Sequence, residues 1–136
     1  MQGFALTGAD NAAFERLLVE VQDAFGHEDY GRLRDLTTPE IMSSLAEELS
    51  QNATKGLRND VTQTQLTEGN VSEVWSEAGV DYATIALTYQ SIDVMRDRTT
   101  QVLVEGDPDH STETTELWTF VRAGGAPWKL SAIQET

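Results

Sequence analysis

The segments ELWTFVR (Glu116–Arg122) and WKLSAI (Trp128–Ile133) decide the fold of this chain. In the first segment Trp118 and Phe120 alternate with smaller residues, and β-branched and aromatic residues at period two predict a strand. The intervening AGGAP (123–127) predicts a turn, because glycine adopts positive φ without penalty and proline ends a strand ladder. Because large aromatic side chains bury much area, we expect this hairpin to form a wall of the core.

The first strand of this hairpin has two different apolar faces. Side chains alternate across a strand, so Trp118 and Phe120 cannot share a face with Leu117 and Val121. We expect one set to pack under helices. The other set is then covered by a partner, for example in a homodimer through the sheet face, or left exposed as an apolar patch. Either outcome would mark that face as a binding surface.

The first part of the chain predicts three helices. A capping-box pattern at Thr7–Asp10 starts the first helix, and Gly26 is expected to end it as a left-handed cap. A short second helix is expected over residues 30–36. The third helix starts at Pro39, because the fixed φ of proline suits a first helical position, and ends before Gly56.

From residue 57 onward the composition changes to Thr, Val, Gln and aromatic residues, which is typical of strands. Strands are expected at 61–75, with a bulge or turn at 68–70, and at 82–95 and 101–104. A phase shift in the apolar pattern of 82–95 predicts a bulge within that strand. Helices followed by an antiparallel meander predict an α+β fold, in which N-terminal helices pack on a curled antiparallel sheet of about four strands. The expected shape is a cone with a cleft between helices and sheet.

Length and charge limit the possible functions. The chain has 136 residues, no cysteine and a formal net charge of −14, which predicts one domain over residues 1–136. The acidic excess argues against nucleic-acid binding and against direct contact with an anionic membrane. It is either a solubility feature or a surface for basic partners such as positively charged peptides. Glu116 and Arg122 lie on one face of a strand and are expected to form a weak surface pair.

No motif predicts a catalytic, metal or cofactor site. His27 and His110 are far apart and no cysteine accompanies them, which argues against a zinc site. The acidic loop 107–113 lacks the glycine and glutamate spacing of a calcium loop. Cone-shaped folds can hold an enzyme site with an Asp or His base and a Tyr donor, and this remains an alternative. The residues available for it are Tyr30, Tyr82, Tyr89 and Asp93.

The cleft between sheet and helices is the expected binding site. The candidates for its lining are five aromatic residues, Tyr30, Tyr89, Trp118, Phe120 and Trp128. Plain core packing is the alternative for the two tryptophans and the phenylalanine. An apolar cleft of this kind could take a peptide or a lipid tail.

Several stretches of the chain, taken in order, resemble one known family. They are FERLL (14–18) with VQ (21–22), LRDLTTPE (33–40), VEGDPD (104–109), LWTFVR (117–122) and WKLSAI (128–133). The ordered set resembles the C-terminal domain of Tim44, a subunit of the mitochondrial inner-membrane translocase, and its bacterial homologues. The same family includes a mitochondrial large-ribosomal-subunit protein. The resemblance covers nearly the whole chain.

This resemblance implies an NTF2-like, cystatin-like cone and a non-enzymatic role. The implied function is a protein-interaction or scaffold domain that binds a protein or peptide partner in protein translocation or membrane-protein assembly. The implied location is a bacterial inner membrane, reached through an upstream segment of a longer protein and not through this domain. The resemblance implies no cofactor. The alternative is a cone cavity that binds a small molecule or a lipid tail.

Overall fold

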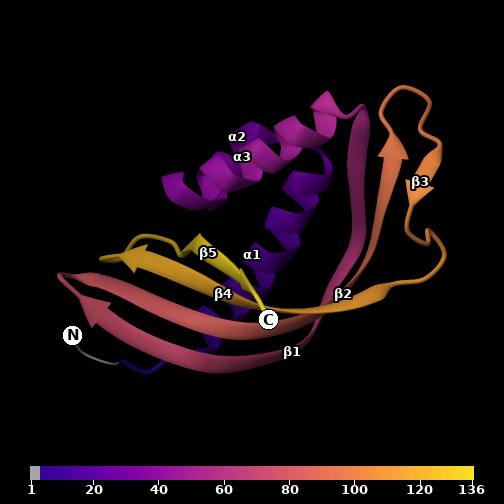
Figure 1. The fold of residues 1–136 in the computed structure, drawn as a ribbon. Helices are drawn as coiled ribbons and strands as arrows, with labels where there is room; N and C mark the ends of the chain where they lie inside the picture. Colours follow the sequence, from indigo (N-terminus) through magenta and orange to yellow (C-terminus); the bar gives the residue numbers. More distant parts are fainter. Residues whose placement is uncertain (1–3) are drawn as a thin grey trace.

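The structure is a computed structural model that describes residues 4–136, with three helices and a five-stranded sheet (Figure 1). The elements are α1 (Gly8–Gly26), α2 (Tyr30–Leu36), α3 (Pro39–Thr54), β1 (Leu57–Glu77), β2 (Val80–Asp97), β3 (Leu103–Glu105), β4 (Thr112–Ala123) and β5 (Lys129–Glu135). The predicted α+β fold of N-terminal helices on a curled antiparallel sheet is confirmed. The sheet has five strands, because the short β3 pairs with β2 outside the main order β1-β2-β4-β5.

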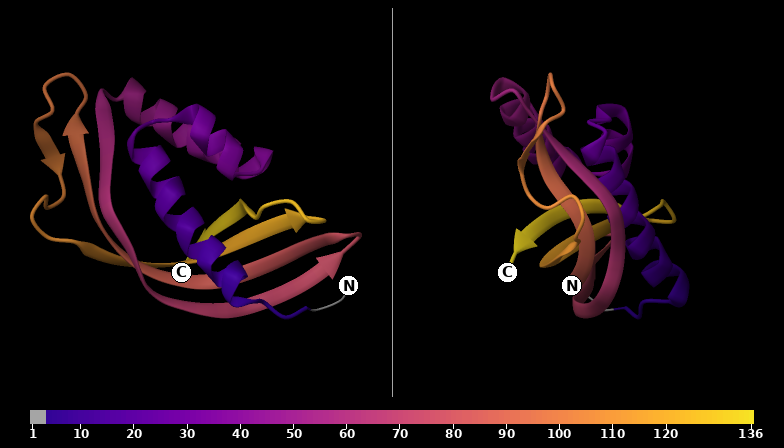
Figure 2. Two further views of the ribbon diagram at one scale, coloured as in Figure 1. Left: turned by 180° about the vertical axis from the view of Figure 1, so that it is seen from behind. Right: turned by 90° about the vertical axis from the view of Figure 1, so that its right-hand side faces the viewer.

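The curl of the sheet comes from extra residues in β1. The register of β1 against β2 shifts at Thr62/Gln65, Leu66/Glu68 and Val71/Glu73, and β1 carries the additional residue each time. Extra residues on one strand bend it and increase its twist. The long hairpin of β1 and β2 therefore curves around α1 and α3, as the two views of Figure 2 show. The bulge predicted at 68–70 is wrong in position, because these residues pair regularly with β2 and the register shifts lie on either side of them.

The bulge predicted inside β2 is wrong. Buried residues alternate regularly from Ala83 to Ser91, and β2 pairs with β4 over Val80–Ser91 without a register shift. The apparent phase change arises because Val94 is buried on the opposite face of the sheet. There the backbone at Gly106 packs on it so closely that an added Cβ would lie 3.1 Å from the Val94 Cα.

The ends of the helices agree with the sequence except at Gly26. The capping box is confirmed, since Thr7 Oγ1 accepts from the Asp10 N–H at 3.2 Å and an Asp10 carboxylate oxygen accepts from the Thr7 N–H at 2.9 Å. Gly56 follows α3 with φ 72°, as expected of a cap glycine. Gly26, in contrast, is the last residue of α1, and an added Cβ would lie 3.0 Å from the Val61 carbonyl oxygen. This glycine permits close approach of α1 to β1 and is not a left-handed cap.

The core lies between α1 and the concave face of the sheet. Trp118 and Phe120 are completely buried there, and Phe14 of α1 stacks on Phe120 with ring centroids 4.4 Å apart. Leu117 and Val121 are half-buried and point to the convex face, which no helix covers in either view of Figure 2. The aromatic set is therefore the one that packs under the helices.

A hydrogen-bonded ion pair joins the start of α1 to the β4–β5 hairpin. Asp10 Oδ1 accepts from Arg122 Nη1 at 2.9 Å and from Trp128 Nε1 at 3.0 Å. Arg122 also pairs with Asp81 at 2.8 Å, and its guanidinium lies 4.4 Å from the centroid of the Trp128 ring. Burial alone would raise the pKa of Asp10, but hydrogen bonds from Thr7 and Trp128 and the charge of Arg122 hold it below its usual range.

Asp10→Asn is expected to lower the free energy of unfolding at neutral pH by about 2–3 kcal/mol, because it weakens the bonds to buried donors. Urea denaturation followed by circular dichroism measures this difference. The exposed Glu15→Gln on the same helix is the control, with a change below about 0.5 kcal/mol. Because the pKa of Asp10 is lowered in the folded state, its contribution is lost as pH falls below about 4. A difference that persists undiminished in acid would contradict this assignment.

Candidate functional site

A cleft of about 360 Å³ lies between α1, α3 and the concave face of the sheet. Its apolar lining comes from all three, and comprises Val21, Phe25, Ile41, Leu45 and Ile133. Its acidic lining comprises Glu48, Asp93, Glu116 and Glu135. None of the described residues that line the cleft is basic. The cleft thus combines an apolar surface with negative charge.

The four carboxylates come from four different elements. Glu48 belongs to α3, Asp93 to β2, Glu116 to β4 and Glu135 to β5. The side-chain amide of Asn59 fixes Asp93 by donating to its Oδ1 at 2.6 Å. Partial burial, together with the negative charges of Asp93, Glu135 and Glu116, raises the pKa of Glu48 above its usual range. A cation that enters the cleft would relieve this repulsion.

Glu116 is held in place by two donors on one of its oxygens. Tyr89 Oη donates to Glu116 Oε1 at 2.7 Å, and Trp118 Nε1 donates to the same atom at 3.0 Å. The Gln22 amide donates in turn to Tyr89 Oη at 3.4 Å. Burial and then Glu116 raise the pKa of Tyr89 well above its usual range, so its hydroxyl remains a donor. Within residues 4–136, Oε2 of Glu116 accepts no hydrogen bond, which leaves it available to an incoming group.

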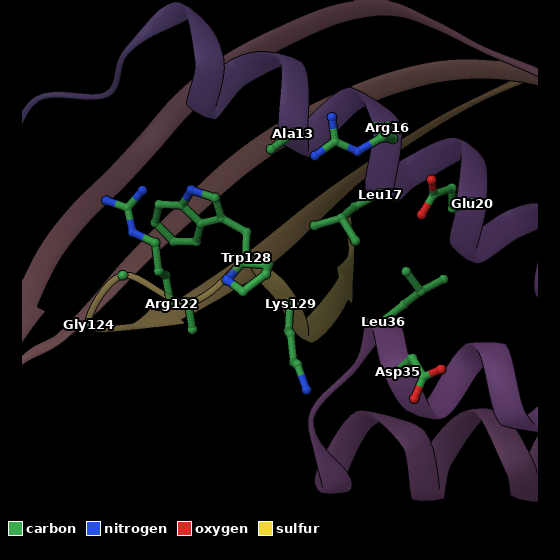
Figure 3. A pocket seen from close by; sticks show the side chains of 13 residues that line it. Ala13, Arg16, Leu17, Glu20, Asp35, Leu36, Arg122, Gly124, Trp128 and Lys129 are labelled. Carbon is green, nitrogen blue, oxygen red and sulfur yellow. The ribbon is translucent and has the colours of Figure 1, made fainter.

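The structure distributes the five predicted lining residues over several places. Tyr89 lines the cleft. Trp118 is buried and does not line it, but its indole N–H donates to Glu116, which does. Phe120 is enclosed in the core against α1. Trp128 lines another groove, of about 430 Å³, where Figure 3 shows its ring beside Arg122. Tyr30 lines a third hollow, between α2 and α3.

The acids of the cleft were not apparent as a group in the sequence, since they lie on separate elements. The one usable signal is that Glu116 and Trp118 are two apart on a strand and therefore share a face. The expected pair of Glu116 with Arg122 is wrong. Arg122 instead pairs with Asp10 and Asp81 at the far end of β4.

The residues considered for an enzyme site do not come together as a set. Tyr89 and Asp93 both line the cleft. Tyr82 lies on the convex face, where its ring stacks on Trp75 with centroids 5.0 Å apart. Tyr30 is the first residue of α2 and lines the separate hollow between α2 and α3. Within the described part of the chain, no group of three or more His, Asp or Glu side chains is placed to hold a metal ion.

Tyr89→Phe is expected to lower the free energy of unfolding by about 1 kcal/mol, because Glu116 loses its shorter hydrogen bond. Urea denaturation at neutral pH measures the change. The control is Tyr30→Phe, whose hydroxyl makes no hydrogen bond within the described residues and whose side chain is 39% exposed. Equal effects of the two substitutions would show that the bond to Glu116 contributes nothing.

No helix among residues 4–136 is both long enough and apolar enough to cross a membrane. A comparison with curated protein sequences gives no significant match. Two similar solved structures share the fold over nearly the whole chain. A periplasmic fragment of TraM has a TM-score of 0.60 at 10% identity, and the alignment covers 97% of this chain and 100% of that fragment. The intermembrane-space region of the chloroplast protein ARC6 has a TM-score of 0.58 at 16% identity, with the same coverage.

A family model also matches the sequence. The model of the Tim44-like domain matches residues 11–135, from the first turn of α1 to the end of β5. This range contains the aromatic hairpin, most of α1, all of α2 and α3, and every residue of the acidic cleft. The chain therefore belongs to the Tim44-like domain family.

Proposed function

We propose that this chain is a non-enzymatic domain that binds a basic, amphipathic polypeptide segment in the cleft between α1, α3 and the sheet. The observation that carries this proposal is the combination of an apolar lining with four carboxylates and no basic residue. The family supports it, since Tim44-like domains are non-catalytic and membrane-associated. The expected setting is an inner membrane, in protein translocation or in membrane-protein assembly.

The cleft suits a helix with one apolar and one basic face. The apolar face would pack on Ile41, Leu45 and Ile133. Lys or Arg side chains would then reach Glu48 and the free Oε2 of Glu116, where charge-assisted hydrogen bonds are stronger than neutral ones. The net charge of −14 would accelerate the encounter with such a segment. The same charge opposes direct binding of this domain to anionic lipid.

A small molecule or a lipid tail in the cavity is the second candidate. The volume of about 360 Å³ falls within the range of small-ligand sites. The acidic lining, however, opposes an uncharged lipid tail, because burying carboxylates against hydrocarbon is costly. A polypeptide with basic side chains satisfies both parts of the lining.

A fluorescent, Lys- and Arg-rich amphipathic peptide is expected to bind in an anisotropy titration, with affinity that falls as salt is added. The double variant Glu48→Gln/Glu135→Gln should weaken binding about tenfold, because two unbalanced charges leave the cleft. Its control is Glu40→Gln/Glu47→Gln, which removes two charges of α3 outside the cleft. Equal losses in the two double variants would mean that only net charge matters.

The pH dependence of the same titration gives a second test. Because the pKa of Glu48 is raised, this residue loses its charge at a higher pH than an ordinary glutamate. As the solution is acidified, binding should therefore begin to weaken while the pH is still above about 4.3, the usual pKa of a glutamate side chain. Glu48→Gln should lack this first phase. A wild-type profile identical to that of Glu48→Gln would contradict the assignment of Glu48.

A further inference from the structure

A second groove, separate from the acidic cleft, runs between the N-terminal half of α1 and the strands β1 and β2. It has a volume of about 480 Å³ and shares no lining residue with the cleft. Its apolar lining comprises Ala12, Phe14, Leu66, Val71, Ile85 and Leu87. Glu15 is the one charged residue among its described lining.

This groove lies beside an open edge of the sheet. β1 is the terminal strand in the sheet order and pairs only with β2 among the described residues, so its other side carries unpaired backbone N–H and C=O groups. Figure 1 shows it as the lowest strand in the lower half of the sheet. The opposite edge is partly closed, since the loop between α2 and α3 bonds to β5 through the Thr38 N–H and the Leu130 C=O at 2.9 Å.

The part of this open edge that adjoins the groove is a short, regular stretch of β1. Register shifts at Leu66/Glu68 and Val71/Glu73 disrupt β1 on both sides of it, and bulges of this kind protect sheet edges from further pairing. Between the shifts, residues 68–71 pair regularly with β2. A strand could therefore be added at this stretch, next to the groove.

The side chains at this stretch leave apolar surface accessible. Val71 lines the groove and is 55% exposed. A large, exposed apolar side chain beside unpaired backbone groups favours association with another chain. Gly69 has no side chain to cover its neighbours in β2, and a Cβ there would lie 3.8 Å from Leu87 and 3.9 Å from Ile85. The groove floor is thus open to a ligand that lies along β1.

We propose that this edge and groove bind an extended polypeptide segment, which adds to β1 as a further strand. Backbone hydrogen bonds to residues 68–71 would hold the segment in register. Its side chains on one face would enter the groove against Val71 and Leu87, with α1 as the opposite wall. This is strand addition between an edge strand and a helix, which differs from a helix lying in the acidic cleft.

Charge defines the other face of the added strand. In β2, Thr88 and Thr84 are each next to a residue that faces the groove, so their side chains point to the opposite face of the sheet. Glu68 pairs with Thr88 and Glu73 with Thr84, so both glutamates also project from that opposite face. Opposite charges across adjacent strands are favourable. The preferred segment therefore alternates apolar residues, which enter the groove, with Lys or Arg residues that face these two glutamates.

A labelled peptide of alternating valine and lysine is the probe for this site. It should bind saturably to the full chain and slow amide hydrogen exchange at residues 68–71, which form the exposed edge. The same peptide with N-methyl groups on alternate backbone nitrogens keeps its side chains but loses donors. It should bind about tenfold more weakly. Equal affinity for the two peptides, or no binding of the unmodified one, would overturn the proposal.

Variants of the protein locate the site. Val71→Arg should weaken binding of the valine–lysine peptide about tenfold, because it removes an apolar contact and adds a like charge. Val102→Arg is the matched control, since Val102 is 62% exposed in the loop before β3, and it should leave the affinity unchanged. Ala12→Trp, an exposed α1 position that lines the groove, should also reduce binding by filling it.

The cleft variants separate this inference from the proposed function. Glu48→Gln/Glu135→Gln should leave binding of the valine–lysine peptide unchanged, because neither residue lines the groove. A loss of binding in that variant, with no effect of Val71→Arg, would place the peptide in the cleft and overturn the inference about β1. Failure of the amphipathic helical peptide to bind would count against the proposed function alone.

Discussion

The aromatic contact between α1 and the β4–β5 hairpin is the interaction on which the rest of the structure depends. Phe14 stacks on Phe120 at 4.4 Å and meets the edge of Trp128 at 5.0 Å. This contact fixes α1 across the concave face of a sheet that is wider than one helix. Space therefore remains on both sides of α1, as the acidic cleft toward α3 and the apolar groove toward β1. Both candidate sites follow from the position of this one helix.

The parts of the fold that could be predicted from the sequence are those with local causes. The capping box at Thr7–Asp10, proline at the start of α3 and the alternation of the aromatic hairpin each depend on neighbouring residues. The errors have causes outside the local segment. Val94 is buried by a distant loop, and Gly26 is required by the approach of β1, so neither position could be interpreted from its own neighbours.

The candidate site was less accessible to prediction than the fold. Aromatic residues were the natural candidates for a cleft lining, yet Phe120 is used to build the core and Trp128 to anchor the hairpin. The acids that give the cleft its charge lie on α3, β2, β4 and β5, and only the curl of the sheet brings them together. That curl depends on register shifts in β1, and the bulge predicted at residues 68–70 falls between two of these shifts rather than at one of them.

The contact of Asp10 with Arg122 and Trp128 also has a consequence for biosynthesis. Arg122 and Trp128 lie 112 and 118 residues after Asp10, so the first helix docks against an element that is made much later. Before the hairpin has emerged, α1 exposes Phe14, Leu17 and Leu18, all of which are buried in the folded domain. The domain therefore completes its fold only after the hairpin has been synthesised, and until then its high negative charge opposes aggregation of the growing chain.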